Sequence, residues 1–371
     1  MPPKRPRGAD RFPKTVEPSA PGQADPAKLY AALDLGTNSC RMLIAQPRGN
    51  QFHVVDSFSK SVQLGLGLER TGRLSTASMN RTIQALSICQ KKLKKHSVER
   101  MRLVATEACR RAKNGAEFLG NVARHAGLEL DIIAPEEEAR LAVISCAPLV
   151  SAKTEQLLVV DIGGGSTELV WIDLSRVPAG ERQRAIMRLH AGFKQDETPD
   201  VPAARVVDWI SVPLGVATLR DQFNDVESDS ARFALMSWYF EEQLAEFSPY
   251  EEEQTREGFQ IVGTSGTVTT VAASHLGLRR YDRNKVDGLR MTSDQIDKVI
   301  RSYLNMGPEG RRADQRIGRD RQALIMSGAA ILQALLRIWP TDRMTVADRG
   351  LREGLLYAQM SADGVLEEGP I

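Results

Sequence analysis

The stretch AALDLGTNSCRMLI at residues 31–44 occurs again in related form as LVVDIGGGSTELVW at residues 158–171. Three positions match at a constant spacing of 127 residues: Asp34 with Asp161, Gly36 with Gly163, and Ser39 with Ser166. Each stretch contains an apolar run, an aspartate, a glycine-containing turn and a second apolar run, an order typical of a β-hairpin. The spacing is too long for a solenoid repeat and predicts a duplicated domain.

The turn of each hairpin has the composition of a phosphate-binding loop. Small residues let backbone N–H groups approach a ligand closely, and successive N–H groups form an anion-binding hollow. We therefore expect phosphate contacts from both turns: Gly36, Thr37, Asn38 and Ser39 in the first, and Gly163, Gly164, Gly165 and Ser166 in the second. The aspartate before each turn has the carboxylate chemistry that holds hydrated Mg²⁺. Two facing hairpins would bind one phosphoryl group from both sides, whereas the simpler interpretation is two ordinary tight turns.

The overall composition is that of an ordinary globular protein. Of the 371 residues, 42% are apolar and 26% are charged, which excludes collagen-like and wholly disordered chains. The length favours two to three domains. No run of about 18 apolar residues exists, so we expect no transmembrane helix. The four cysteines lack C-x-x-C spacing, which disfavours a zinc ribbon or a disulfide framework and favours the cytoplasm.

The first 28 residues differ from the rest of the chain. They hold six basic and three acidic residues and seven of the 18 prolines, so we expect a disordered, basic, proline-rich tail. This tail lacks the apolar segment of a secretory signal, and it serves either as a solubilising leader or as an arm that recruits a polyanion. The net charge of +2 and the low aromatic content give no indication of a nucleic-acid partner.

Helical and strand patterns alternate after each hairpin. We expect helices at 76–96, 136–147 and 231–247, and strands at 101–106 and 260–262, the last running into a turn at 263–267 that opens a further helix. This order predicts an α/β fold in which helices flank mixed sheets. We place the two domains at 29–150 and 151–371. Residues 173–208 are charged and lack periodicity, so we expect them to be largely a surface insertion.

Seven motifs in this order resemble those of the exopolyphosphatase / guanosine pentaphosphate phosphohydrolase family. They are ALDLGTNSCRMLIA (32–45), ATEACRRAKNG (105–115), EEEARL (136–141), VVDIGGGSTELV (159–170), VPLGVATL (212–219), VGTSGTVTT (262–270) and DRGLREGLLY (348–357). The resemblance implies two duplicated ribonuclease H-like domains of the actin-like ATPase type, with the active site in the cleft between them. It further implies the short, two-domain form and a C-terminal helix that packs back on the first domain.

The same resemblance assigns the catalytic carboxylates. In EEEARL, Glu138 corresponds to the base that activates water, and Glu137 takes this role if the register shifts by one residue. A positioned base contributes roughly 10²- to 10⁴-fold in rate. Favourable interaction of an acidic first turn with the helix dipole would explain Glu136 and Glu137 without any catalytic role. The family pattern also implies Mg²⁺, or another divalent cation, held by Asp34, Asp161 and Glu168.

Two arginines and a third loop complete the expected site. Arg110 matches a family position and either binds phosphate or forms a structural ion pair, and Arg41 could point either way along its strand. The third loop, which we expect to bind further phosphates or a guanosine, consists of Gly263, Thr264, Ser265, Gly266 and Thr267. A polyanion path, or merely a solvated surface, could be formed by Arg279, Arg280, Arg283, Lys285, Arg311, Arg312, Arg316 and Arg319.

Other features are negative or depart from the family. The sequence has no H-E-x-x-H motif and no P-loop, so zinc hydrolysis and a P-loop ATPase are unsupported. A lone Cys40 is expected to be packing rather than a nucleophile. Around residue 323, family members commonly carry Arg-Ala-Asp, and here Ala323 occupies the acidic position, which puts any role of that carboxylate in doubt.

The expected activity is hydrolysis of the terminal phosphoanhydride of inorganic polyphosphate with release of orthophosphate. Hydrolysis of guanosine pentaphosphate uses the same groups and is the alternative, followed by a phosphotransferase and a non-catalytic alarmone sensor. The absence of an aromatic-rich base pocket favours polyphosphate. We expect no nucleic-acid or membrane partner, and family analogy implies a homodimer.

Overall fold

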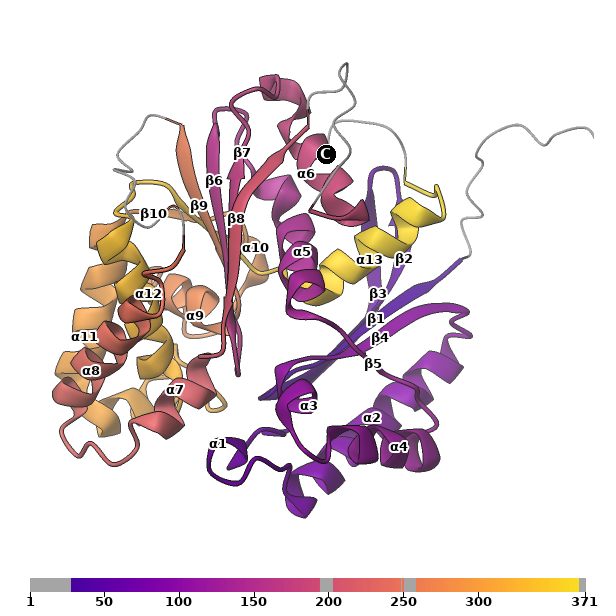
Figure 1. Cartoon of the computed structure of the whole chain (residues 1–371), viewed down its shortest axis with the longest axis horizontal. Coiled ribbons are helices and arrows are strands. Elements are labelled where there is room, and N and C mark those ends of the chain that lie inside the picture. The colour runs from indigo at the N-terminus through magenta and orange to yellow at the C-terminus, as the bar shows by residue number, and fades with distance from the viewer. Residues whose placement is uncertain (1–27, 194–202, 248, 250–257, 367–371) are drawn as a thin grey trace, which may run out of the picture.

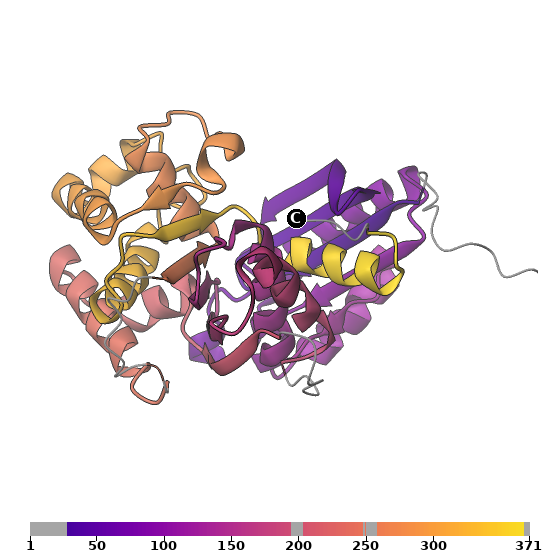
Figure 2. The ribbon, with the colours of Figure 1, turned by 90° about the horizontal axis from the view of Figure 1, so that it is seen from above.

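The computed structural model describes residues 28–193, 203–247, 249 and 258–366 (Figure 1). The tail predicted at residues 1–28 therefore lies, except for Lys28, outside the described residues. No helix in the described part of the chain is both long enough and apolar enough to cross a membrane. Two sheets stand side by side, each with helices on both faces (Figures 1 and 2).

Both sheets are mixed and share a local topology. The first has the order β3-β2-β1-β4-β5 and contains β1 (Tyr30–Leu35), β2 (Ser39–Arg48), β3 (Gln51–Ser61), β4 (Arg100–Ala105) and β5 (Asp131–Ile132). The second has the order β10-β11-β9-β6-β7-β8 and contains β6 (Gln156–Ile162), β7 (Thr167–Asp173), β8 (Arg205–Val212), β9 (Phe259–Thr264), β10 (Arg290–Met291) and β11 (Met344–Ala347). In each sheet a central strand pairs antiparallel with the next strand and parallel with a later one.

Helices cover the outer faces and fill the space between the sheets. Those of the first half are α1 (Leu68–Thr71), α2 (Thr76–Lys95), α3 (Glu107–Arg111), α4 (Gly115–Ala126) and α5 (Pro135–Cys146). Those of the second half are α6 (Arg182–Arg188), α7 (Val216–Gln222), α8 (Asp229–Glu242), α9 (Gly266–His275), α10 (Arg283–Val286), α11 (Ser293–Ala313), α12 (Ile325–Ile338) and α13 (Leu351–Ala362). The predicted α/β fold of mixed, helix-flanked sheets is confirmed.

The two halves exchange helices across the centre. Helix α13 packs against β1 and β4, where Leu355 and Tyr357 share a core with Tyr30 (Figure 2). Helix α5 packs on the second sheet, where Ala139 and Val143 join a core with β6 and β7. We call the first sheet with α1–α4 and α13 the first lobe, and the second sheet with the remaining helices the second lobe.

Residues 173–208 are not a surface insertion where the structure describes them. Helix α6 buries Ala185 and Ile186 in the second-lobe core, and β8 forms the edge of the second sheet along β7. Strand β8 is half-buried along most of its length, so its sequence lacks the alternation that marks a strand with one buried face. The helix expected at 231–247 is also shorter, because α8 ends at Glu242 and turns follow it.

Candidate active site

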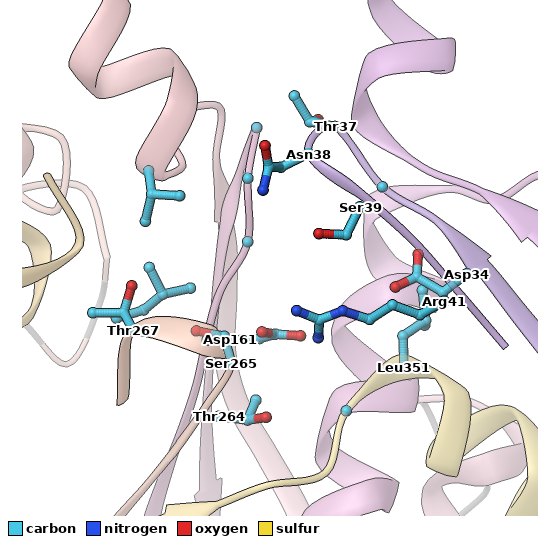
Figure 3. Close-up of a pocket in the computed structure, with 18 of the residues that line it drawn as sticks. Asp34, Thr37, Asn38, Ser39, Arg41, Asp161, Thr264, Ser265, Thr267 and Leu351 are labelled. Carbon is cyan, nitrogen blue, oxygen red and sulfur yellow. The ribbon is translucent and has the colours of Figure 1, made fainter. Parts of the chain in front are cut away.

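The two glycine-containing turns lie against each other at the base of a cleft between the lobes (Figure 3). A Cβ added to Gly165 would lie 2.4 Å from the Thr37 hydroxyl oxygen, and one on Gly164 would lie 3.2 Å from the Asn38 nitrogen. Only residues without a side chain let the turns approach so closely. Asp34 and Asp161 line the same cleft, as the duplicated hairpins require.

Carbonyl groups of both turns accept hydrogen bonds from backbone N–H groups of neighbouring segments. In the first turn, the Thr37 carbonyl accepts a hydrogen bond from Gly65 N–H and the Asn38 carbonyl accepts bonds from residues 62 and 63. In the second, Gly163 and Gly164 accept bonds from the first N–H groups of α7. Within the described residues, five N–H groups of these turns have no acceptor: those of Thr37, Asn38, Gly164, Gly165 and Ser166. Successive unpaired N–H groups of this kind can bind an anion, and phosphate binding by these turns stays a prediction.

The buried hydroxyl of Thr37 adds a sixth group to these five unpaired donors. Thr37 is only 6% exposed, and its Oγ1 has no hydrogen-bond partner among the described residues. A buried hydroxyl without a partner costs free energy, so a ligand oxygen at this point would remove that cost.

Glu138 lies in the first turn of α5 and faces the cleft. Its side chain is 12% exposed. The Arg110 guanidinium, which also holds Glu107 at 2.6 Å and the Ile133 carbonyl at 2.7 Å, donates to Glu138 Oε2 from two nitrogens at 3.3 Å. Arg110 therefore holds the carboxylate in place in the cleft that the unpaired N–H groups also line.

The environment of Glu138 favours the protonated form of its carboxyl group. Burial, and then the negative charge of Glu168, raises the pKa of Glu138 well above its usual range, although Arg110 acts in the opposite direction. A raised carboxyl pKa in a cleft is common for catalytic bases.

Two of the predicted charged residues, Glu137 and Arg110, lie outside the cleft lining. Glu137 points away from it and pairs with Arg102 at 3.1 Å, so the one-residue shift of register is excluded by geometry. Arg110 does not line the cleft, because its nitrogens are bonded to Glu107, Glu138 and a carbonyl. The structural ion pair, the alternative that the sequence left open, is what the structure shows.

The second hairpin carries a pair of like charges. Asp161 and Glu168 are register partners on β6 and β7, and like charges directly opposite one another repel. Burial, and then the charge of Asp34, raises the pKa of Asp161 to about 7. Burial, and then the charge of Asp161, raises the pKa of Glu168 to about 8, although Ser211 Oγ donates to Glu168 at 2.9 Å.

The first hairpin carries opposite charges at the same register. Asp34 faces Arg41 across β1 and β2, and Arg41 points into the cleft toward Asp161 (Figure 3). Burial raises the pKa of Asp34 while Arg41 opposes that change. The Arg41 guanidinium forms no ion pair or hydrogen bond with any other described residue, and burial and the nearby Arg352 lower its pKa.

The expected metal ligands line the cleft but do not form a ready-made cage. Among the described residues, no three His, Cys, Asp or Glu side chains gather closely enough to hold a metal ion by themselves. Mg²⁺ needs fewer, since it commonly keeps several waters and takes one or two carboxylates plus phosphate oxygens. The repelling pair of Asp161 and Glu168 supplies two oxygen donors whose negative charge favours a cation, so the residues fit Mg²⁺ in this limited sense.

The third loop contributes four of its five predicted residues to the cleft. Thr264, Ser265, Gly266 and Thr267 line it, and the Thr264 hydroxyl donates to the Arg349 carbonyl. Gly263 does not, because it lies inside β9, where an added Cβ would be 2.3 Å from Met344 Cε. Gly263 is therefore required for packing, and the structure does not bring it to the cleft with the other four residues.

Several cleft residues were not assigned from the sequence. They are Lys60, Thr106, Glu107, Arg321, Arg349 and Arg352, together with Asp320 and Asp348. A signal was present, because Asp348, Arg349 and Arg352 belong to the DRGLREGLLY motif. Ala323, at the position that is acidic in the family, is exposed and outside the cleft lining.

The basic residues proposed as a polyanion path do not form one continuous surface. Arg311 is 4% exposed and holds Asp229 through two hydrogen bonds, so its role is structural. Arg316 binds Asp314, and Arg283 pairs with Asp348 and Glu353. None of the eight lines the cleft.

Residues 43–363 match the Ppx/GppA phosphatase family. The chain belongs to this family. The guanosine-5'-triphosphate,3'-diphosphate pyrophosphatase of Aeromonas salmonicida is 30% identical over 332 residues, which cover 89% of this chain and 59% of that protein. The corresponding protein of Aeromonas hydrophila is 29% identical over the same shares. The chain thus spans less than two thirds of the length of these curated relatives.

Solved structures agree with this assignment. The Aquifex aeolicus Ppx/GppA family member superimposes with a TM-score of 0.69 at 30% identity, over 91% of this chain and 98% of that one. An exopolyphosphatase from Cytophaga hutchinsonii gives a TM-score of 0.73 at 21% identity, over 91% and 99% of the two chains, which supports the fold alone. The resemblance to this family and its two-domain, actin-like architecture is confirmed.

Proposed function

We propose that this Ppx/GppA phosphatase hydrolyses the terminal phosphoanhydride of inorganic polyphosphate and releases orthophosphate. The observation that carries the proposal is the position of Glu138. Its buried carboxylate, fixed by Arg110, lines the same cleft as the unpaired N–H groups of the two turns. This arrangement supports a base and an anion cradle that act in one cleft.

The chain's own groups account for the required steps. A terminal phosphoryl group binds through its oxygens to the turn N–H groups and the Thr37 hydroxyl, which stabilise the charge that spreads over these oxygens. Glu138 accepts a proton from the attacking water and orients it in line with the bond that breaks. Carboxylates Asp161 and Glu168 would hold Mg²⁺, which neutralises phosphate oxygens when bound.

The cleft lining favours a polyphosphate chain over a nucleotide. No aromatic residue is among the described residues that line it, and aromatic side chains are the usual stacking partners of a nucleobase. Guanosine pentaphosphate is the second candidate, supported by the names of the Aeromonas relatives. Both substrates end in a phosphoanhydride that the same base and cradle would serve.

Two adjacent glutamates offer a matched test. We expect Glu138→Gln to lower phosphate release from polyphosphate by roughly 10²- to 10⁴-fold in kcat, while polyphosphate binding is retained. Glu137→Gln changes the same chemical group one residue earlier in α5 but outside the cleft, and we expect near-normal activity. Equal effects of the two changes on kcat would contradict the proposal.

The substrate is tested by comparing phosphate release from long-chain polyphosphate and from guanosine pentaphosphate, with Mg²⁺ and no acceptor. A higher kcat/KM for polyphosphate supports the primary proposal, and the reverse order supports the second candidate. Formation of ATP from added ADP, or of a sugar phosphate from an added sugar, without release of orthophosphate would instead identify a phosphotransferase. Binding of the guanosine compound without any release would identify a sensor.

A further inference from the structure

Ser265 adopts a backbone conformation that is normally reserved for glycine. It lies between β9 and α9 with φ of 100° and ψ of 178°, a region in which an L side chain costs about 1–3 kcal/mol. The preceding and following elements both begin or end in the cleft. A serine that persists at a glycine position requires an explanation from its side chain.

The hydroxyl of Ser265 has no structural task. Ser265 is the N-cap of α9, yet its side chain does not accept the capping hydrogen bond that serine commonly makes there. Its Oγ is buried and has no partner among the described residues. The strain is therefore not offset by a hydrogen bond from this side chain to any described residue, and a ligand that bonds to this hydroxyl would explain both features.

Three arginines line the cleft in the same region. Arg41 reaches in from the first lobe (Figure 3), and the charges of Arg352 and Arg321 act on its guanidinium. Arg321 holds the start of α9 by donating to the Gly266 carbonyl at 2.6 Å and to Thr269 Oγ1 at 3.1 Å. Like charges this close repel, so their convergence in a partly buried cleft favours a polyanion.

Arg352 is held only weakly by the described residues around it. It lies in the first turn of α13, and its ion pair with Glu353 is long at 3.8 Å. Glu353 in turn accepts a hydrogen bond from the Gly350 N–H at 3.0 Å, which fixes the helix start. The positive end of α13 and the Arg352 guanidinium thus face the same space.

We propose that the Ser265 hydroxyl, Arg41 and Arg352 form a second phosphate subsite, which binds the phosphate next to the one that is cleaved off. This subsite rests on the proposed hydrolysis of a phosphoanhydride. It would bind the leaving group of that reaction, which is the phosphate chain that remains after the terminal phosphoryl group is removed. The turns hold the terminal phosphoryl group, and Arg41, between the turns and Ser265 (Figure 3), neutralises the oxygen that leaves. Ser265 and Arg352 hold the phosphate that carries this oxygen.

The test measures binding in a Glu138→Gln background, so that no turnover occurs. Calorimetric titration with tripolyphosphate, which fills both subsites, is compared with orthophosphate, which fills the first. We expect Arg352→Gln and Ser265→Gly each to weaken tripolyphosphate binding at least tenfold and to leave orthophosphate binding within twofold. Arg290→Gln, at an exposed arginine of β10 outside the cleft, controls for net charge and should change neither.

Ser265→Gly separates a binding role from a structural one. Glycine adopts the observed backbone angles without strain, so this variant should unfold at a higher temperature than its parent while it loses tripolyphosphate affinity. A purely structural serine would lower both the stability and the affinity on replacement.

The experiments distinguish an error in the proposed subsite from an error in the proposed function, because the two predict different results. Unchanged tripolyphosphate affinity in both variants, or an equal loss of orthophosphate affinity, would overturn the subsite while phosphate release by the unmodified enzyme still stands. If the Glu138→Gln parent binds no tripolyphosphate and the unmodified enzyme releases no phosphate, the proposed function itself is wrong.

Discussion

The two hairpins of the cleft share their topology and the position of the aspartate, and they differ in the charge of one register pair. In the first, Asp34 faces Arg41, and in the second, Asp161 faces Glu168. Arg41 and Glu168 occupy equivalent positions, 127 residues apart. One hairpin is thus close to neutral, whereas the other concentrates negative charge that raises two carboxyl pKa values.

Because of this difference, the two copies of the motif favour ligands of opposite charge. The pair of opposite charges places a cation, Arg41, in the cleft, where it has no partner among the described residues. The pair of like charges favours an external cation. The change between Arg41 and Glu168 therefore makes the first copy of the turn favourable for anions and the second favourable for cations.

The largest expected effect is on activity, and its dependence on Mg²⁺ should differ between variants of the first and second hairpins. We expect Glu168→Gln to lower kcat/KM by about a hundredfold or more and to raise the Mg²⁺ concentration for half-maximal activity, because it removes one oxygen donor. Arg41→Gln should lower kcat/KM by roughly ten- to a hundredfold through lost phosphate contacts, with Mg²⁺ half-saturation unchanged. Phosphate release measured across a Mg²⁺ titration checks both, and the same Mg²⁺ shift in each variant would remove the distinction.

The next effect is on the pH dependence of cation binding. A metal binds the deprotonated carboxylates, and Asp161 and Glu168 lose their protons at about pH 7 and 8. Affinity for Mg²⁺ should therefore rise about tenfold or more between pH 6 and pH 8.5. Titration calorimetry at several pH values measures this rise, and Glu168→Gln should flatten it. A pH-independent affinity in the unmodified protein would contradict the charge-pair account.

A smaller effect concerns stability without metal. The pKa of Asp161 is raised from 3.8 to about 7 on folding, so stability is present below pH 4 and is lost as the pH rises through 7. Asp161→Asn should raise the free energy of unfolding at pH 8 by on the order of 2 kcal/mol and change little at pH 4. Asp34→Asn, whose carboxylate faces Arg41, should gain less. Chemical denaturation with a chelator present tests the order, and a larger gain for Asp34→Asn would reverse the comparison.

The smallest effect compares the equivalent turn glycines. A Cβ on Gly163 would lie 2.8 Å from the Ser166 carbonyl oxygen, whereas one on Gly36 would meet nothing closer than 3.7 Å. Gly163→Ala should therefore destabilise the protein by about 1–2 kcal/mol, and Gly36→Ala by less than about 0.5 kcal/mol. Denaturation midpoints measure both, and equal losses would show that the two turns are equally tight.

The sequence predicts the hairpins, the fold class and the convergence of both turns on one cleft, because these rest on local patterns that are repeated. It also favours Glu138 over Glu137, but only by resemblance. What distinguishes the two glutamates physically is which face of α5 they occupy. Glu138 is on the face toward the cleft and accepts a hydrogen bond from Arg110, whereas Glu137 accepts one from Arg102 outside the cleft. That orientation depends on packing between lobes, which no local pattern records.

The missed residues come from distant parts of the chain. Arg321 precedes α12 and Arg352 begins α13, so their presence beside Arg41 depends on the arrangement of whole helices. Arg110 is the opposite kind of error: the sequence suggests a phosphate ligand, but the side chain lies outside the cleft lining. Its guanidinium could bind phosphate as well as Arg41 could, and only its three hydrogen-bond partners reveal a positioning role. Strand β8 was missed because a half-buried edge strand lacks clean alternation.

The position of α13 determines when the first lobe can fold. Its C-terminal neighbour Asp363 accepts hydrogen bonds from Lys28, Tyr30 and Arg100, and the first of these spans 335 positions. Domains usually fold in the order of their synthesis, yet this lobe receives its last core helix only after the other lobe has left the ribosome. A nascent first half would therefore expose the apolar face of its sheet until α13 is synthesised and covers it.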